Sequence, residues 1–251
     1  RGGQAVPRDQ VSVGDLAAGN TTLAGVRKAA RSNPEQHTGM TWRRTSGDGK
    51  FVAFQNKAAR YGANDTNGKS DVFVRDLAAA KTTRVSVTSS GAQANGDSYL
   101  DSISTNGSVV GFNSYATNLV PNDTNAKSDA YVRKGNQTIR VNVSSSGAQA
   151  NNQSICSNVS GDGRYVAFCS QATNLVTGDT NAGVDAFWRD LQTGVTRRVS
   201  VSTSGAQANN GSPWPVISPD GKYVMFESDA TNLVTGDTNA KRDIFLSGPQ
   251  F

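Results

Sequence analysis

The stretch "ATNLVTGDTNAGVDAFWRD", residues 172–190, contains a polar phrase, Asp-Thr-Asn-x-x-x-Asp, that leads directly into an aromatic run. The same phrase returns at 116–133 and 230–246, and a shorter version stands at 62–76. The first aspartates of successive copies are spaced by about 57 residues. Because one phrase repeated at a regular period indicates a repeated structural unit, the copies predict architecture before they predict chemistry.

Each repeat predicts four short antiparallel strands. The first strand ends at a serine before a glycine-containing turn such as "GDG" or "PDG", which is a hairpin signal. A second apolar strand follows, then the loop with the phrase, a third strand that starts near its last aspartate, and a fourth strand such as "TTRVSV". Repeated four-stranded units are typical of propeller blades. The sequence therefore predicts an all-β fold, a β-propeller of four-stranded antiparallel blades.

The domain organisation follows from the repeat. A single propeller domain is expected over 1–251, with repeat units of about 38–97, 98–151, 152–211 and 212–251. The last unit stops after its third strand, and the N-terminal segment 11–26 is expected to supply the missing strand. The alignment of "VSVGDLAAGNTT" (11–22) with "VFVRDLAAAKTT" (72–83) supports this closure. Four blades are favoured, with an incomplete five-bladed propeller as the alternative.

These motifs resemble a known family. The pattern S-x-D-G-[KR]-[FY]-V-x-F, the phrase itself, "TTRVSV" and "SGAQAN" are similar to the WD-like repeats of TolB-type β-propellers, especially secreted actinobacterial ones. The resemblance covers roughly residues 38–251. It implies the propeller fold and fixes no catalytic residue, because propellers host binders and enzymes alike.

Composition narrows the class of protein. Hydrophobic residues make up 35% of the 251 residues and the mean hydropathy is −0.49, so no run is long enough to predict a membrane span. No apolar leader stands at the N-terminus, so an export signal is expected to be removed or to lie outside this chain. The net charge is +5, but the arginines recur at repeated positions, where they are expected to brace turns. No clustered aromatic and basic face indicates a nucleic-acid partner.

The prediction of the cellular compartment rests on two cysteines. Cys156 and Cys169 lie at equal distances from the middle of the turn 161–163, so they are expected to face each other across a hairpin. A disulfide between them would place the protein in an oxidising, secreted or extracytoplasmic location. The alternative is a pair of small buried thiols.

The repeated phrase has two interpretations. Its oxygen-bearing residues are Asp65, Asn67, Asp71, Asp123, Asn125, Asp129, Asp179, Asn181, Asp185, Asp237, Asn239 and Asp243. Carboxylate and amide oxygens in a tight loop are ligands for Ca²⁺, the one cofactor the sequence suggests. However, the phrase lacks the late bidentate glutamate of an EF-hand loop, and Asp and Asn also bond nearby backbone N–H groups in turns. A structural turn is favoured, with a calcium site as the alternative.

Ligand chemistry is expected where the repeats differ. At equivalent positions of the innermost strands, two units carry Trp42 and Trp214, and Arg43 and Asp101 stand one residue further on in their own units. Two tryptophans near one channel mouth would form a stacking platform for a sugar ring or a peptide. Packing between blades is favoured for both tryptophans, with ligand contact as the alternative, and packing is also expected for Trp188.

The sequence offers few catalytic candidates. The weak ones are Asp101, Glu227, Glu35 and the only histidine, His37. Glycoside hydrolysis needs two carboxylates at a defined separation, and no such pair is apparent. A nucleophile motif of the G-x-S-x-G type is absent from the sequence. The sequence leans against an enzyme; if it is one, a glycoside hydrolase or polysaccharide lyase is expected.

The functional prediction is a secreted binding or interaction module whose ligand is a carbohydrate or a protein segment. One alternative is a polysaccharide-degrading hydrolase or lyase on the same scaffold. Another is a structural propeller fragment of a longer protein. The expected partner is a polysaccharide or protein ligand, with no nucleic acid, no membrane insertion and a monomeric state.

Overall fold

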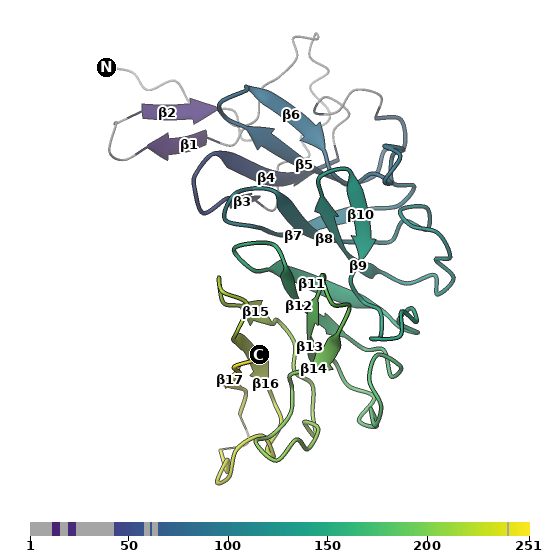
Figure 1. Ribbon diagram of the computed structural model, residues 1–251, viewed down its shortest axis with the longest axis vertical. Coiled ribbons are helices and arrows are strands. Elements are labelled where there is room, and N and C mark those ends of the chain that lie inside the picture. The colour runs from purple at the N-terminus through teal and green to yellow at the C-terminus, as the bar shows by residue number, and fades with distance from the viewer. Residues whose placement is uncertain (1–11, 16–19, 24–42, 58–60, 62–64, 240) are drawn as a thin grey trace.

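The computed structural model describes residues 12–15, 20–23, 43–57, 61, 65–239 and 241–251, and their regular elements are all strands (Figure 1). The strands are β1 (Ser12–Asp15), β2 (Asn20–Leu23), β3 (Arg43–Thr45), β4 (Phe51–Asn56), β5 (Asp71–Asp76), β6 (Lys81–Arg84), β7 (Ser98–Ile103), β8 (Val109–Ser114), β9 (Asp129–Lys134), β10 (Gln137–Arg140), β11 (Ser154–Val159), β12 (Tyr165–Ser170), β13 (Asp185–Asp190), β14 (Thr196–Arg198), β15 (Val216–Ile217), β16 (Val224–Ser228) and β17 (Asp243–Ser247). Within this part of the chain no helix could cross a membrane.

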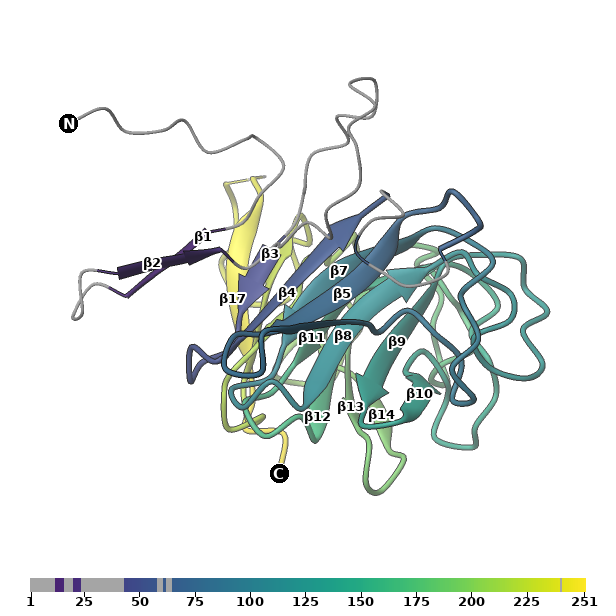
Figure 2. The same cartoon turned by 90° about the horizontal axis from the view of Figure 1, so that it is seen from above.

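Strands β3 to β17 form four successive antiparallel meanders, and β1 and β2 form a separate hairpin. The first three sheets are four-stranded (β3–β6, β7–β10 and β11–β14), and the fourth contains β15, β16 and β17. Figure 1 shows the sheets following one another from the first at the top to the fourth at the bottom, and Figure 2 gives the same arrangement from above. The prediction of an all-β, four-bladed propeller is confirmed.

The predicted hairpin turns join the first and second strands of each sheet and connect neighbouring sheets. In the first, the Ser46 hydroxyl donates to Asp48 at 2.6 Å and accepts the N–H of Phe51 at 3.0 Å, which closes the turn locally. Successive turns also bond to one another. The N–H of Asp48 donates to the carbonyl of Thr105, Thr105 donates to Gly161, and Gly161 donates to Pro219, at 2.9, 2.9 and 2.8 Å. These bonds hold the four sheets in sequence around their inner edge.

Apolar side chains fill the spaces between successive sheets. Each sheet pairs an aromatic residue of its second strand with one of its third: Phe54–Phe73, Phe112–Tyr131, Phe168–Phe187 and Phe226–Phe245, with ring centroids 5.4–5.9 Å apart. Between the second and third sheets, Phe168 and Phe187 pack against Val109, Ala130 and Val132, all fully buried. Burial of this kind is the main stabilising contribution to the fold.

The described residues contradict the prediction that an N-terminal strand closes the propeller. The described part of segment 11–26 forms its own hairpin, in which β1 pairs with β2, and the sheets are not closed into a ring by hydrogen bonds. A hairpin joined by a short connection loses little chain entropy, whereas pairing with β17 would join opposite ends of the chain. Among the described residues, β17 pairs only with β16.

One face of the fourth sheet is exposed. Val216, Met225 and Leu246 are direct neighbours across its strands, and Ile244 lies on the same face. Their exposed fractions run from 44% to 70%, whereas Phe226 on the opposite face is buried against the third sheet. We call Val216, Met225, Ile244 and Leu246 the end face.

Candidate functional site

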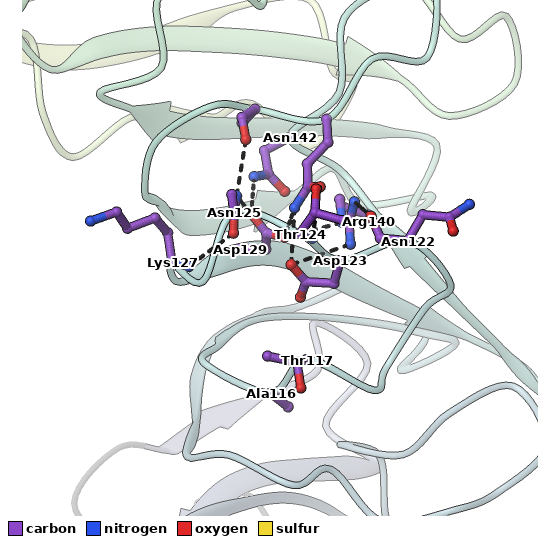
Figure 3. Close-up of polar contacts among 12 residues, drawn as sticks. Ala116, Thr117, Asn122, Asp123, Thr124, Asn125, Lys127, Asp129, Arg140 and Asn142 are labelled. Atoms are coloured by element: carbon purple, nitrogen blue, oxygen red, sulfur yellow. Dashed lines mark hydrogen bonds and ion pairs between the residues drawn. The ribbon is translucent and has the colours of Figure 1, made fainter.

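The repeated phrase builds a buried cluster around an arginine, shown for the second copy in Figure 3. Arg140 Nε lies 3.1 Å from Asp129 Oδ2, and its Nη2 lies 3.7 Å from Asp123 Oδ1. The carboxamide of Gln149 donates to both carboxylates, at 3.0 and 3.1 Å. The side chains of the two aspartates are at most 2% exposed. We call this set of two aspartates, one arginine and one glutamine the acid–arginine cluster.

The first and third copies repeat the arrangement. Arg84 lies 3.2 Å from Asp71 and 3.8 Å from Asp65. Arg198 lies 3.5 Å from Asp185 and 3.6 Å from Asp179. The glutamines that bridge the carboxylates are Gln93 and Gln207, at 2.8–3.0 Å. The arginine comes from the end of the fourth strand and the glutamine from the "SGAQAN" connector, so the cluster fastens three segments of each repeat.

The asparagine of the phrase forms the predicted turn. Asn125 Oδ1 accepts the N–H of Lys127 at 2.9 Å, and its Nδ2 donates to the carbonyl of Ala150 at 2.9 Å. The same N–H to Oδ1 bond occurs at Asn67, Asn181 and Asn239. The last aspartate begins the third strand in every copy, as expected. The Asx-turn interpretation is confirmed.

Electrostatics explains why an arginine belongs there. Burial raises the pKa of Asp71, Asp129 and Asp185, because a carboxylate removed from water loses hydration, while hydrogen bonds and the arginine oppose that rise. In these copies the guanidinium occupies the position beside both carboxylates, so a calcium ion would have to displace it. No group of three or more His, Cys, Asp or Glu suited to a metal occurs among the described residues. Calcium at these loops stays a prediction.

The fourth copy differs from the other three. Asn239 Nδ2 donates to Asp243 at 3.1 Å, but no described arginine or glutamine reaches the pair formed by Asp237 and Asp243. Asp237 Oδ1 is buried and has no hydrogen-bond partner in the described part of the chain. A cavity of about 410 Å³ lies beside these aspartates, with Phe245 in its wall.

The sequence predicted part of this cluster. The repeated arginine was expected to brace a repeated turn, and Arg84, Arg140 and Arg198 confirm it. The glutamine was missed, although it recurs at one place in each "SGAQAN" connector. That recurrence at fixed spacing was the signal available.

The predicted tryptophan platform is described only in part. Trp42 lies outside the described residues, whereas Trp214 precedes β15 and is 56% exposed. Packing between blades, the favoured interpretation, is therefore wrong for Trp214. Its backbone is left-handed, with φ 57°, as is that of the equivalent Cys156 with φ 65°, so this conformation is not peculiar to Trp214. Trp188 is packed as predicted: it is 3% exposed, and its indole N–H donates to Gly221.

Arg43 and Asp101, the two polar partners predicted for the platform, lie in different surroundings. Arg43 is exposed on β3, while Asp101 lies at a bulge of β7 between the second and third sheets. Asp101 accepts the N–H of Ser157 at 2.9 Å and the amide of Asn113 at 3.2 Å, and burial raises its pKa to about 6. The arginine whose charge opposes this rise is Arg44. Asp101 thus links two sheets.

Asp101 predicts a pH dependence of stability. Because folding raises its pKa, the folded protein keeps a proton that the unfolded chain releases, so its contribution falls as the pH rises from about 4 to about 6. Asp101→Asn should remove this dependence. Its advantage over the unmodified chain should grow by about 1–3 kcal/mol between pH 4 and neutral pH, measured by urea unfolding. An equal difference at both pH values would contradict the assignment.

The catalytic candidates do not assemble. Glu227 lies on β16 of the fourth sheet, where Arg242 pairs with it at 3.5 Å and with Asp229 at 2.7 Å. Asp101 is in the second sheet, where it bonds Asn113 and Ser157, so the two acids lie in different sheets with different partners. Glu35 and His37 lie outside the described residues.

The cysteines are close but not bonded. The register opposes Ile155 to Cys169, and the bulge that follows turns Cys156 towards its partner, with the sulfurs 2.8 Å apart. The predicted proximity is confirmed, whereas the directly opposed pairing is wrong because the bulge shifts the register. The hydrogen bond from Cys169, and then burial, raise the pKa of the Cys156 thiol.

Mild oxidation of the folded protein should join these thiols. A bridge across a loop of about 15 residues is expected to add about 3 kcal/mol to the free energy of unfolding. Intact-mass analysis should record the loss of two hydrogens, and the melting temperature should rise. Two thiols that remain alkylatable after oxidation would contradict the prediction.

Comparison with known proteins supports the fold. No family model and no curated protein matches the chain. A putative TolB from Agrobacterium tumefaciens has a similar structure, with TM-score 0.54 and 16% identity over 96% of this chain and 70% of that one. TolB from Acinetobacter baumannii gives 0.50 and 12% over 96% of this chain and 46% of its own. Pyrococcus horikoshii acylaminoacyl peptidase gives 0.51 and 8% over 94% of this chain and 33% of its own. The chain is an all-β protein with the TolB-type β-propeller fold.

Proposed function

We propose that the chain is a binding or interaction module on a propeller scaffold, and that it takes a carbohydrate or a protein segment at the inner strand of the fourth sheet. The observation that carries the proposal is the exposed indole of Trp214. A large aromatic ring costs free energy when it faces water, and it offers a flat face for a sugar ring or an apolar side chain.

The surroundings of Trp214 support binding over catalysis. Pro213 and Pro215 flank it, and Pro215 is buried, so the ring stands on a short stiff segment. Binding to a rigid platform loses little conformational entropy. The described acids that might act in hydrolysis, Asp101 and Glu227, each have a partner that accounts for them.

We also propose a secreted or extracytoplasmic location, no nucleic-acid partner and a monomeric state. The cysteine pair within bonding reach supports the location, and the oxidation experiment described above tests its chemical basis.

The test is a pull-down with a panel of cell-wall and plant polysaccharides and of proline-rich peptides. Trp214→Ala should weaken retention at least about tenfold, with a nearly unchanged melting temperature, because the ring is mostly in water. Tyr115→Ala is the matched control, since Tyr115 is 54% exposed just after β8 of the second sheet, and this variant should retain binding.

The supernatant is assayed for new reducing or unsaturated sugar ends. Retention without such ends agrees with a binding module. Release of sugar ends, or equal retention by the Trp214→Ala variant, contradicts the proposal.

A further inference from the structure

A groove of about 630 Å³ lies on the outer side of the second sheet, where the connector from the first sheet passes β10. Its walls are the connector residues 88–90, the loop 117–123 and Thr138 of β10. This volume is within the range of about 300–1,000 Å³ that is usual for small-ligand pockets. We call it the hydroxyl groove, because Ser, Thr and Asn side chains make up most of its polar lining.

The connector wall offers a hydroxyl group that the fold uses only in part. Ser89 Oγ accepts the N–H of Thr138 at 3.1 Å, and its O–H has no acceptor among the described residues. In the third sheet the equivalent Ser145 accepts the N–H of Thr196 at 2.9 Å and also donates to the carbonyl of that residue at 3.2 Å. The second sheet therefore keeps a donor that its neighbour uses internally.

The loop wall adds a second donor, an amide and an apolar ring. Thr117 Oγ1 accepts the side-chain amide of Asn95 at 2.9 Å, so its own hydrogen remains available. Asn122 is exposed, its side chain extends away from Arg140 in Figure 3, and its carboxamide has no partner in the described part of the chain. Pro121 beside it is exposed as well.

The loop also departs from the repeat at one dipeptide. The second copy reads "PN" at 121–122, whereas the third and fourth copies read "TG" at 177–178 and 235–236. The first copy reads "AN" at 63–64, which lie outside the described residues. The two glycines have φ 72° and 83°, and Asn122 has φ 57°, so the dipeptide changes the side chains of the loop and keeps its left-handed backbone.

We propose that the hydroxyl groove binds a neutral saccharide, at a site separate from Trp214. Sugar hydroxyls both donate and accept hydrogen bonds, and the side chains of Ser89, Thr117 and Asn122 do the same. Pro121 supplies an apolar surface for the C–H groups of a sugar ring.

Charge and backbone chemistry disfavour other ligands. Among the described residues that line the groove, Asp123 is the charged one, and its carboxylate already faces Arg140 at 3.7 Å and Gln149 at 3.0 Å. An ionic ligand therefore finds no unpaired opposite charge in this lining. An extended peptide would need the outward N–H groups of β10, and that of Thr138 is taken by Ser89.

The test is carried out in the whole chain with Trp214→Ala, so that its result does not depend on the proposed function. Cellohexaose and mannohexaose, both neutral, are titrated into isotope-labelled protein, and the backbone amide resonances are followed by NMR. With at least one of them, shifts should gather at 88–90 and 117–123. The equivalent amides at 144–146 and 173–179 should not shift. Hexagalacturonate and a proline-rich peptide are the charged and the peptide probes, and neither should shift the groove.

A double variant tests the site itself. Pro121→Thr with Asn122→Gly writes the dipeptide of the third and fourth copies, so the backbone conformation and the melting temperature should be kept. Hexasaccharide binding should weaken at least about tenfold, because the ring and the amide are lost. Asn106→Asp is the matched control: it writes into the inner turn of the same sheet the residue of the other three turns, and it should bind as the parent does.

Four outcomes would each overturn the proposal: no shifts with either neutral sugar, equal shifts at the third-sheet equivalent, a groove that takes the charged or peptide probe instead, or unchanged affinity of the double variant. None of them bears on Trp214, which is absent from the tested chain. In the unmodified chain two weak sites on one polymer act together, so loss of Trp214 still lowers retention in the pull-down.

Discussion

Replacing Arg198 with glutamine is expected to lower the free energy of unfolding by about 3–5 kcal/mol. The arginine side chain is 9% exposed, and the carboxylates of Asp179 and Asp185 beside it are 3% and 0% exposed. Removal of the guanidinium leaves two buried carboxylates without a counter-charge, which costs more than the pair itself contributes. Denaturant unfolding of the purified variant measures this loss.

The neighbouring residue provides the control. Arg197 is exposed, bonds the carbonyl of Gln250 and lies over the ring of Trp188, so Arg197→Gln should cost less than about 1 kcal/mol. Adding Asp185→Asn to Arg198→Gln should recover part of the lost stability, because one uncompensated charge disappears. Equal, small effects of both arginine variants would show that the acid–arginine cluster is not a stabilising element.

Truncation of Phe168 to alanine is also expected to cost about 3–5 kcal/mol. Its ring is fully buried, stacks on Phe187 at 5.4 Å and fills the space against the second sheet. The cavity left behind cannot collapse, because strands on both sides are held by complete ladders. Thermal or denaturant unfolding measures the effect.

The matched truncation is Leu246→Ala on the end face. Leu246 is 69% exposed, so its loss should change the free energy of unfolding by less than about 0.5 kcal/mol. A cost comparable with that of Phe168→Ala would mean that the end face is covered in solution, against the open arrangement of the fourth sheet.

Local chemistry explains how much of the fold could be predicted. The serine-to-turn spacing and the glycine turns identified every inner hairpin, because those bonds lie within a few residues, such as Ser160 with Asp162 and Tyr165. The strand that closes the last blade could not be predicted in the same way. Its alignment was ambiguous, and a local hairpin within 11–26 competes with a pairing between opposite ends of the chain.

Site residues that recur in every repeat could be predicted from the sequence. Residues at which one repeat differs from the others were harder to predict. The Asx turns and the arginines that pair with the aspartates follow from residues that recur at the same place in the repeats. The bulge at Cys156 shifts the strand register through a left-handed backbone conformation that the residue type does not predict. The sequence therefore predicted the contact with Cys169 but not the strand register at that contact. Whether Trp214 faces water or the core could not be predicted from the repeat, because the equivalent Leu100 and Cys156 are buried whereas Trp214 is 56% exposed.

Hydrogen–deuterium exchange of the four phrases tests the central claim most directly, namely that an arginine locks three of them and leaves the fourth open. The account predicts slow exchange in fragments covering 65–71, 123–129 and 179–185, where side chains of the connector bond the loop, as Gln207 does with the N–H of Thr180. It predicts fast exchange in 237–243, where, among the described residues, the connector does not bond the loop and the N–H of Lys241 donates to Asn239. Equal protection of all four fragments would contradict the account.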